Sequence, residues 1–315
     1  MPQQKKGKKS KIILLSKVKQ LYLSRFHYTY RGEKGEVVPK STTKVKFSSS
    51  VDSIEKNSFR RCDSLRGIII PPSIESIGRN AFDRCESLTS VEISSTLRVI
   101  GKGAFAGCTS LETIDVPSSV ERIGENAFYE CKSLMQINLP PSIQTIGQFV
   151  FTGCANLRSI EIPCNVKCIR KCAFAGCKSL SNVTLPPSLQ CIDALAFSGC
   201  ASIATIDFPP SLQYIGHRAF AECTSLEKVY INQNTYLDDS VFPEFTTVIR
   251  SSWYEVGTCI LLRELFMGER AAAKQLSEEG SQKELQVIQM FLTSANNDIF
   301  RSTLDFLVYK KKDVV

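Results

Sequence analysis

The chain has 315 residues, of which 43% are hydrophobic and 22% are charged, so it can bury a sizeable core and is not disordered throughout. Its net charge of +8 is uneven: residues 1–46 hold 13 Lys and Arg against two acids, which leaves −3 on the remaining 269 residues. The basic balance therefore does not indicate nucleic-acid binding by the whole protein. No apolar run reaches the roughly 18 residues of a transmembrane helix, so none is predicted.

The N-terminal segment, residues 1–44, is predicted to be a basic tail followed by a cap. The tail is interpreted mainly as solvated, although five of its lysines have the pattern of a nuclear-localisation or polyanion-binding patch: Lys5, Lys6, Lys8, Lys9 and Lys11. Residues 12–30 combine an apolar helical face with a strand-like end. We expect them to cover the first coil of the repeats, or else to lie on a membrane surface. The apolar run 12–15 is shorter than a signal core of roughly 7–15 residues. We therefore expect no signal peptide and a cytoplasmic or nuclear location.

A 23-residue repeat dominates residues 45–231. Two series of side chains advance by 23 without a slip. The phenylalanines are Phe59, Phe82, Phe105, Phe128, Phe151, Phe174, Phe197 and Phe220. The cysteines are Cys62, Cys85, Cys108, Cys131, Cys154, Cys177, Cys200 and Cys223. Such a period predicts a solenoid, in which equivalent residues of successive coils stack about 4.8 Å apart.

Two motifs recur in each repeat, where h is aliphatic. The run L-x-x-h-x-h-P begins at Leu111, and I-G-x-x-A-F-x-x-C spans Ile123 to Cys131. On these motifs the sequence resembles the BspA-like, or treponema-type, leucine-rich repeats over about residues 45–231. The resemblance implies a leucine-rich-repeat solenoid of about nine coils, with short parallel β-strands on its concave face. Many BspA-like proteins are surface-associated and bind host or matrix proteins.

Each coil is predicted to hold a short strand, an I-x-x-I-G segment, and a turn or short helix that carries A-F-x-x-C. Proline ends most of the strands because it cannot donate to the ladder. The glycines of the I-x-x-I-G segment predict a tight turn or a positive φ, with Arg170 and Asp193 as exceptions in that column. The column contains Gly78, Gly101, Gly124, Gly147 and Gly216.

The period falters after residue 231. We interpret 232–255 as a degenerate last coil, in which Phe242 continues the phenylalanine column one residue early and Val248 replaces the strand leucine. Residues 256–315 have helical periodicity and a capping box at Ser281-x-x-Glu284. They are predicted to form a C-terminal helical cap on the last coil, or a separate docking arm.

The thirteen cysteines are mostly one structural column, which is typical of buried thiols and favours a reducing compartment. Cys164, Cys168, Cys172 and Cys177 have spacings near those of zinc ligands, but they fall at different places around one coil. No metal or cofactor is therefore predicted. Cys168 and Cys191 face outward one coil apart. We expect a disulfide there in an oxidising compartment and thiols in the cytosol.

The concave strand face is the predicted binding surface, because alternation along each strand turns every second side chain outward. One outward column is mainly acidic, and the other holds hydroxyl and amide groups. The acidic column contains Glu92, Asp115, Asn138, Glu161 and Asp207. The second contains Ser90, Thr113, Gln136, Ser159 and Thr205. This surface suits a protein or peptide ligand, above all a basic one, although a merely solvated face is the alternative.

The sequence holds two histidines and no phosphate loop, nucleophile elbow or metalloprotease motif, so we predict a non-enzymatic protein. Our main expectation is an intracellular protein–protein interaction scaffold that uses the concave face. One alternative is a cell-surface or secreted adhesin of the BspA-like type. The other is a nuclear or polyanion-associated protein, in which nucleic acid would bind only the N-terminal lysines.

Overall fold

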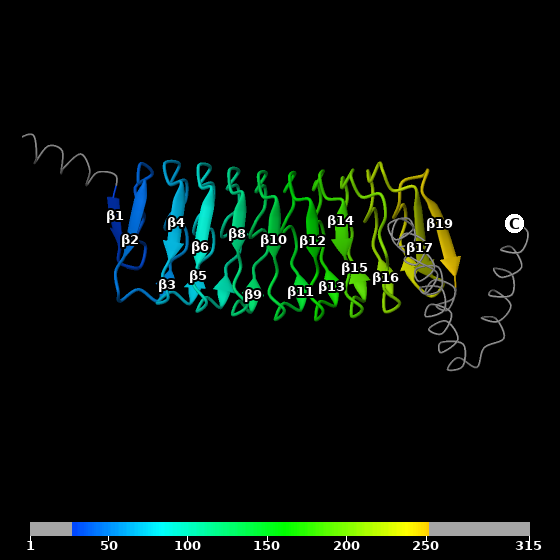
Figure 1. Ribbon diagram of the computed structural model, residues 1–315, viewed down its shortest axis with the longest axis horizontal. Coiled ribbons are helices and arrows are strands. Elements are labelled where there is room, and N and C mark those ends of the chain that lie inside the picture. The colour runs from blue at the N-terminus through cyan, green and yellow to red at the C-terminus, as the bar shows by residue number, and fades with distance from the viewer. Residues whose placement is uncertain (1–26, 252–315) are drawn as a thin grey trace, which may run out of the picture. The chain divides into compact units, whose positions relative to one another are not determined.

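The computed structural model describes residues 27–251, which form a β-solenoid of about nine turns (Figure 1). All paired strands in this part of the chain are parallel. Most pairs join residues one repeat apart: Ile114 lies opposite Ile137. The predicted leucine-rich-repeat solenoid is therefore confirmed, and the 23-residue period is the length of one turn.

Most turns contribute strands to two rows, which run along the stack (Figure 1). The first row, which carries the predicted binding surface, contains β1 (His27–Tyr30), β2 (Lys44–Phe47), β4 (Gly67–Ile70), β6 (Ser90–Ile93), β8 (Thr113–Asp115), β10 (Gln136–Asn138), β12 (Ser159–Glu161), β14 (Asn182–Thr184), β17 (Lys228–Asn232) and β19 (Thr247–Ser251).

The second row consists of two-residue strands built from the I-x-x-I-G segment. It contains β3 (Ser53–Ile54), β5 (Ser76–Ile77), β7 (Val99–Ile100), β9 (Arg122–Ile123), β11 (Thr145–Ile146), β13 (Cys168–Ile169), β15 (Cys191–Ile192), β16 (Tyr214–Ile215) and β18 (Tyr236–Leu237). In most of them the isoleucine points into the core.

The A-F-x-x-C segments are turns, and the described residues contain no helix. Their backbone N–H groups donate to the following turn of the solenoid, as Phe59 does to the Ala81 carbonyl at 2.8 Å. The second row donates in the opposite direction, as Glu75 does to Asp52 at 2.8 Å. Backbone groups on both sides are thus satisfied by neighbouring turns.

The glycine column has a different cause from the one expected. Gly78, Gly101 and Gly124 do not have positive φ. Instead, a Cβ at Gly78 or Gly101 would lie 2.6 Å from a carbonyl oxygen of the preceding turn. Glycine is therefore needed because successive backbones approach closely at this point.

The positive φ values lie elsewhere, in two further columns that flank the phenylalanine. One column, two residues before the phenylalanine, contains Asn57, Asn80, Gly103, Asn126, Phe149, Cys172, Leu195 and Arg218. The other, directly before the cysteine, contains Arg61, Arg84, Gly107, Glu130, Gly153, Gly176, Gly199 and Glu222. The asparagines and glycines in these columns fit a left-handed backbone.

The phenylalanine column forms the centre of the core. Neighbouring rings from Phe59 to Phe220 stack with centroids 4.9–5.7 Å apart. Each buried ring contributes roughly 1.5–3 kcal/mol. At the N-terminal end Tyr30 packs on Phe59 at 5.2 Å, and its hydroxyl accepts from the Glu55 N–H at 2.8 Å. Phe242 stacks on Phe220 at 5.3 Å, which extends the column past the regular repeats.

Two details at the C-terminal end differ from expectation. Val248 lies opposite Val229 in the β17–β19 pair, so it occupies a strand position rather than that of the leucine. Residues 205–207 form no strand, so the first row lacks a strand between β14 and β17. Its strand pairing also stops between β2 and β4 and between β10 and β12. The bulky Phe208 follows residues 205–207 and packs edge-on against Phe220 at 5.6 Å. The predicted helices of 256–315 and the lysine tail lie outside the described residues.

Candidate interaction surface

The first row of strands turns alternate side chains to solvent. In β8, Thr113 and Asp115 are exposed and Ile114 is buried, and β10 and β12 repeat the pattern. We use the name strand face for the exposed residues of β6 to β14. They are Ser90, Thr113, Gln136, Ser159 and Asn182 in one column, and Glu92, Asp115, Asn138, Glu161 and Thr184 in the other.

The structure brings eight of the ten predicted site residues together on the strand face. Asp115 lies opposite Asn138, and Thr113 lies opposite Gln136. Thr205 and Asp207 are also exposed, but they lie on the segment without a strand. The predicted alternation is kept there without strand pairing, and the part of these two residues in binding stays a prediction.

The carboxylates of the strand face share one column of the first row and have no internal partner among the described residues. Within residues 27–251, Glu92, Asp115 and Glu161 form no ion pair and no side-chain hydrogen bond. On other faces, some acids pair with a base of the preceding turn: Asp83 with Arg60 at 2.7 Å, Glu121 with Arg98 at 2.9 Å, and Glu125 with Lys102 at 2.5 Å. Asp63, Glu75 and Glu86 are exposed and form no ion pair within residues 27–251, but the three do not all share one column. The strand face thus presents unneutralised negative charge in a regular array.

Other groups border this array. Ile69, opposite Glu92, is 66% exposed and gives the N-terminal end of the surface an apolar contact. Lys44 and Lys46 of β2 are exposed beyond it. At the opposite end the ammonium group of Lys228 lies 4.9 Å from the centroid of the Tyr230 ring. The negative array is therefore flanked by basic residues on both sides.

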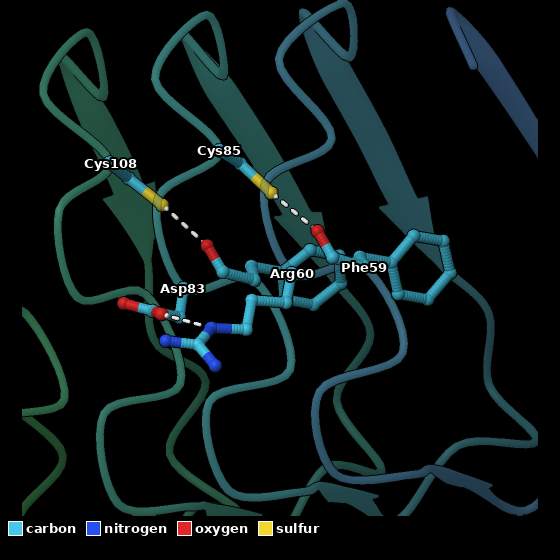
Figure 2. Close-up of polar contacts among 6 residues, drawn as sticks. Phe59, Arg60, Asp83, Cys85 and Cys108 are labelled. Carbon is cyan, nitrogen blue, oxygen red and sulfur yellow. Dashed lines mark hydrogen bonds and ion pairs between the residues drawn. The ribbon is translucent and has the colours of Figure 1, made fainter. Parts of the chain in front are cut away.

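The eight cysteines of the column are buried, as predicted. From Cys85 onward, each Sγ donates to the carbonyl oxygen of the phenylalanine in the preceding turn at 3.0–3.2 Å. Figure 2 shows two of these bonds, from Cys85 and Cys108, beside the Arg60–Asp83 ion pair. Burial raises the pKa of the Cys131 and Cys154 thiols. These thiols are therefore structural rather than reactive.

Besides the cysteine column, a column of mainly hydroxyl side chains bonds to the preceding turn, and the sequence analysis did not predict it. After the prolines, one side chain per turn donates to a backbone carbonyl of the preceding turn, as Ser119 does to Leu97 at 2.7 Å and Ser211 to Leu189 at 2.6 Å. The recurring serine after P-P or P-S in the repeat was the available signal. Its function is to satisfy buried carbonyl groups.

The four cysteines with zinc-like spacing have separate environments. Cys168 forms a disulfide with Cys191, whose Cα lies 4.7 Å away. Cys177 donates to the Phe151 carbonyl, Cys172 is buried and Cys164 is exposed. Among the described residues no cluster of His, Cys, Asp and Glu could hold a metal ion. The bonded pair also departs from the expectation of free thiols in a reducing compartment.

A family model for the BspA type leucine rich repeat region matches residues 39–158 and 144–252, with six copies of the repeat. The chain belongs to this family. A BspA-type repeat is thus the origin of both the 23-residue period and the unbroken phenylalanine and cysteine columns. No family of enzymes is indicated.

Two solved structures of leucine-rich repeat proteins are similar to this chain in fold and sequence. A leucine-rich repeat protein from Bacteroides ovatus is 29% identical, with a TM-score of 0.56, and the match covers 73% of this chain and 64% of that one. The T. pallidum leucine-rich repeat protein is 30% identical, with a TM-score of 0.51, over 61% of this chain and 91% of that one. The chain therefore spans less than two thirds of the B. ovatus protein. A search of the curated proteins finds no match.

The expected cytoplasmic or nuclear location is contradicted by these comparisons. The finding that overturns it is the match to the BspA type leucine rich repeat family over residues 39–158 and 144–252. The description of the protein as intracellular is therefore withdrawn. No helix in residues 27–251 is long and apolar enough to cross a membrane.

Proposed function

We propose that this chain is an extracytoplasmic binding solenoid of the BspA type, which holds a protein or peptide partner on its strand face. The observation that carries the proposal is the array of unpaired carboxylates at Glu92, Asp115 and Glu161, which lie in one column of the strand face. An unpaired surface charge is available to a partner without first breaking an internal ion pair. The array favours a ligand rich in Lys and Arg.

Two further observations support a role at the cell surface. The family match links the chain to BspA-type repeats, and the Cys168–Cys191 disulfide fits an oxidising environment. Exposed protein would be digested when intact producing cells are treated with protease. Digestion only after lysis would contradict the surface location.

Binding is tested by selecting a displayed peptide library on the immobilised solenoid. We expect enrichment of peptides with clustered Lys and Arg, and weaker capture at high salt because screening acts on exposed charges. The same selection on a strand-face variant, Glu92→Lys, Asp115→Lys and Glu161→Lys, should lose this enrichment. Equal enrichment on both proteins, or none on the wild type, would contradict the proposal.

A further inference from the structure

The Cys168–Cys191 disulfide joins two turns of the solenoid at one point of the second strand row. Both residues are partly exposed, and they lie opposite each other in the β13–β15 pair. The bond ties the turn that contains residues 182–204 to the turn before it. We call residues 182–204 the stapled turn.

The stapled turn departs from the N-terminal turns at two positions. Asp193 occupies the glycine column, as Arg170 does in the preceding turn, whereas Gly101 and Gly216 approach the preceding backbone closely. Leu195 has φ of 59°, in a column where the N-terminal turns place Asn or Gly. A leucine is disfavoured in the left-handed region because its Cβ comes too close to the following carbonyl oxygen.

The stapled turn also lacks one strand pair with the turn that follows it, residues 205–227. Its first-row strand β14 pairs with β12, but residues 205–207 of the next turn form no strand beside it. Other contacts join the stapled turn to the following turn. Cys191 pairs with Tyr214 in the second row, and Phe197 stacks on Phe220 at 5.1 Å. A repeat protein is stabilised mainly by contacts between neighbouring turns, so this junction is a weak point.

We propose that the Cys168–Cys191 disulfide is a site of thiol–disulfide exchange, whose opening by a dithiol loosens the stapled turn. A thiolate of the dithiol attacks one sulfur, and the other cysteine leaves as a thiolate. The second thiol of the reagent then displaces the remaining cysteine. The reagent becomes a cyclic disulfide, and the protein gains two thiols, so the two electrons balance. Partial exposure gives the reagent access, while the buried thiols of the column stay outside the reaction.

Amide hydrogen exchange with and without dithiothreitol tests the proposal on the unaltered protein. The informative amides are Gln190, which donates to Lys167 at 2.8 Å, Asp193, which donates to Ile169 at 2.8 Å, and Leu195, which donates to His217 at 3.0 Å. We expect reduction to speed their exchange by about tenfold or more, with Gly101 and Gly124 unchanged. Equal exchange in both states, or the absence of the disulfide in protein folded under air, would overturn the proposal.

A matched control places the same bond at a regular junction. Val99 and Arg122 are opposite each other in the same column, so Val99→Cys with Arg122→Cys creates an equivalent pair between turns that keep their glycines. Reducing this pair should change local exchange by less than twofold. A tenfold change there as well would overturn the claim that the stapled turn is specifically weak.

A second variant restores the consensus in the stapled turn. Asp193→Gly with Leu195→Asn should make exchange in this turn nearly independent of dithiothreitol, because the turn no longer depends on the disulfide. A response as large as that of the wild type would overturn the assignment of the weakness to these two residues.

Discussion

At the scale of single residues, position 195 holds a leucine in a column of positive φ where the N-terminal turns place Asn or Gly. Leu195 and Asn126 share one column and have φ of 59° and 56°. Asparagine tolerates this region better than leucine. We predict that Leu195→Asn raises the free energy of unfolding by about 1 kcal/mol, and that Asn126→Leu lowers it by a similar amount. Urea unfolding measures both, and a lower midpoint for Leu195→Asn would contradict this account.

The buried thiols predict a pH dependence. Burial raises the pKa of Cys131 and Cys154 in the folded state, whereas the unfolded thiols titrate near pH 8.5–9. Above this pH the unfolded chain binds fewer protons, so stability is complete below it and falls as pH rises. Each thiol adds a slope of about 1.4 kcal/mol per pH unit.

Replacing one column cysteine isolates that effect. Cys131→Val should make the fall in unfolding free energy between pH 9 and pH 10, measured by urea unfolding, shallower by up to about 1.4 kcal/mol. The tyrosines and lysines remain in both proteins, so their titration cancels in the difference. Identical slopes for the two proteins would show that the thiol does not ionise on unfolding in this range.

The residue types of the core could be predicted because burial acts on every turn alike. Phe and Cys recur without a slip, and their columns are buried throughout. The conformation of the glycines could not be predicted, because close approach and positive φ both select glycine and only the structure separates them. The asparagines at 57, 80 and 126 were the sequence signal for positive φ.

At the scale of the elements, the distance between successive turns is set at the glycine column. A Cβ at Gly101 would lie 2.6 Å from the Ile77 carbonyl oxygen, but at Gly147 its nearest neighbour is Val150 Cγ2 at 3.2 Å. We predict that Gly101→Ala costs about 1–3 kcal/mol in thermal or urea unfolding, and that Gly147→Ala costs less than about 1 kcal/mol. An equal cost for the two substitutions would contradict the close-approach explanation.

The register of the strands could be predicted from the sequence, but the absence of a strand at 205–207 could not. Parallel pairing at a spacing of 23 follows from the period alone, and the pairing of Ile114 with Ile137 follows it. The loss of a strand at 205–207 depends on how this segment and Phe208 pack. Ile206 and Phe208 are buried and keep the apolar alternation, so the pattern does not reveal the break.

At the scale of the whole molecule, sequence reasoning identified the fold and the family and failed on location. The odd cysteine count and the buried column favoured a reducing compartment, yet the two cysteines outside the column at 168 and 191 are bonded. A buried thiol is compatible with either compartment, because burial shields it from oxidants and raises its pKa, as for Cys131 and Cys154. The informative cysteines were the exposed ones.

Recognition by the strand face is likewise a property of the assembled solenoid. Glu92, Asp115 and Glu161 lie far apart in sequence, and the stacking of β6, β8 and β12 in one row places them in one column. Alternation predicted which residues face outward. The pattern could not show which acids are paired, since pairing depends on side chains one turn away.

The most direct test of the account is the affinity of one selected Lys-rich peptide for three proteins by titration calorimetry. They are the wild type, the strand-face variant, and a charge-matched control with Asp63→Lys, Glu75→Lys and Glu86→Lys on other exposed surfaces. We predict that the strand-face variant binds at least about tenfold more weakly, or about 1.4 kcal/mol, and that the control binds within about threefold of the wild type. Equal weakening of both variants would mean that net charge, rather than the strand face, holds the peptide.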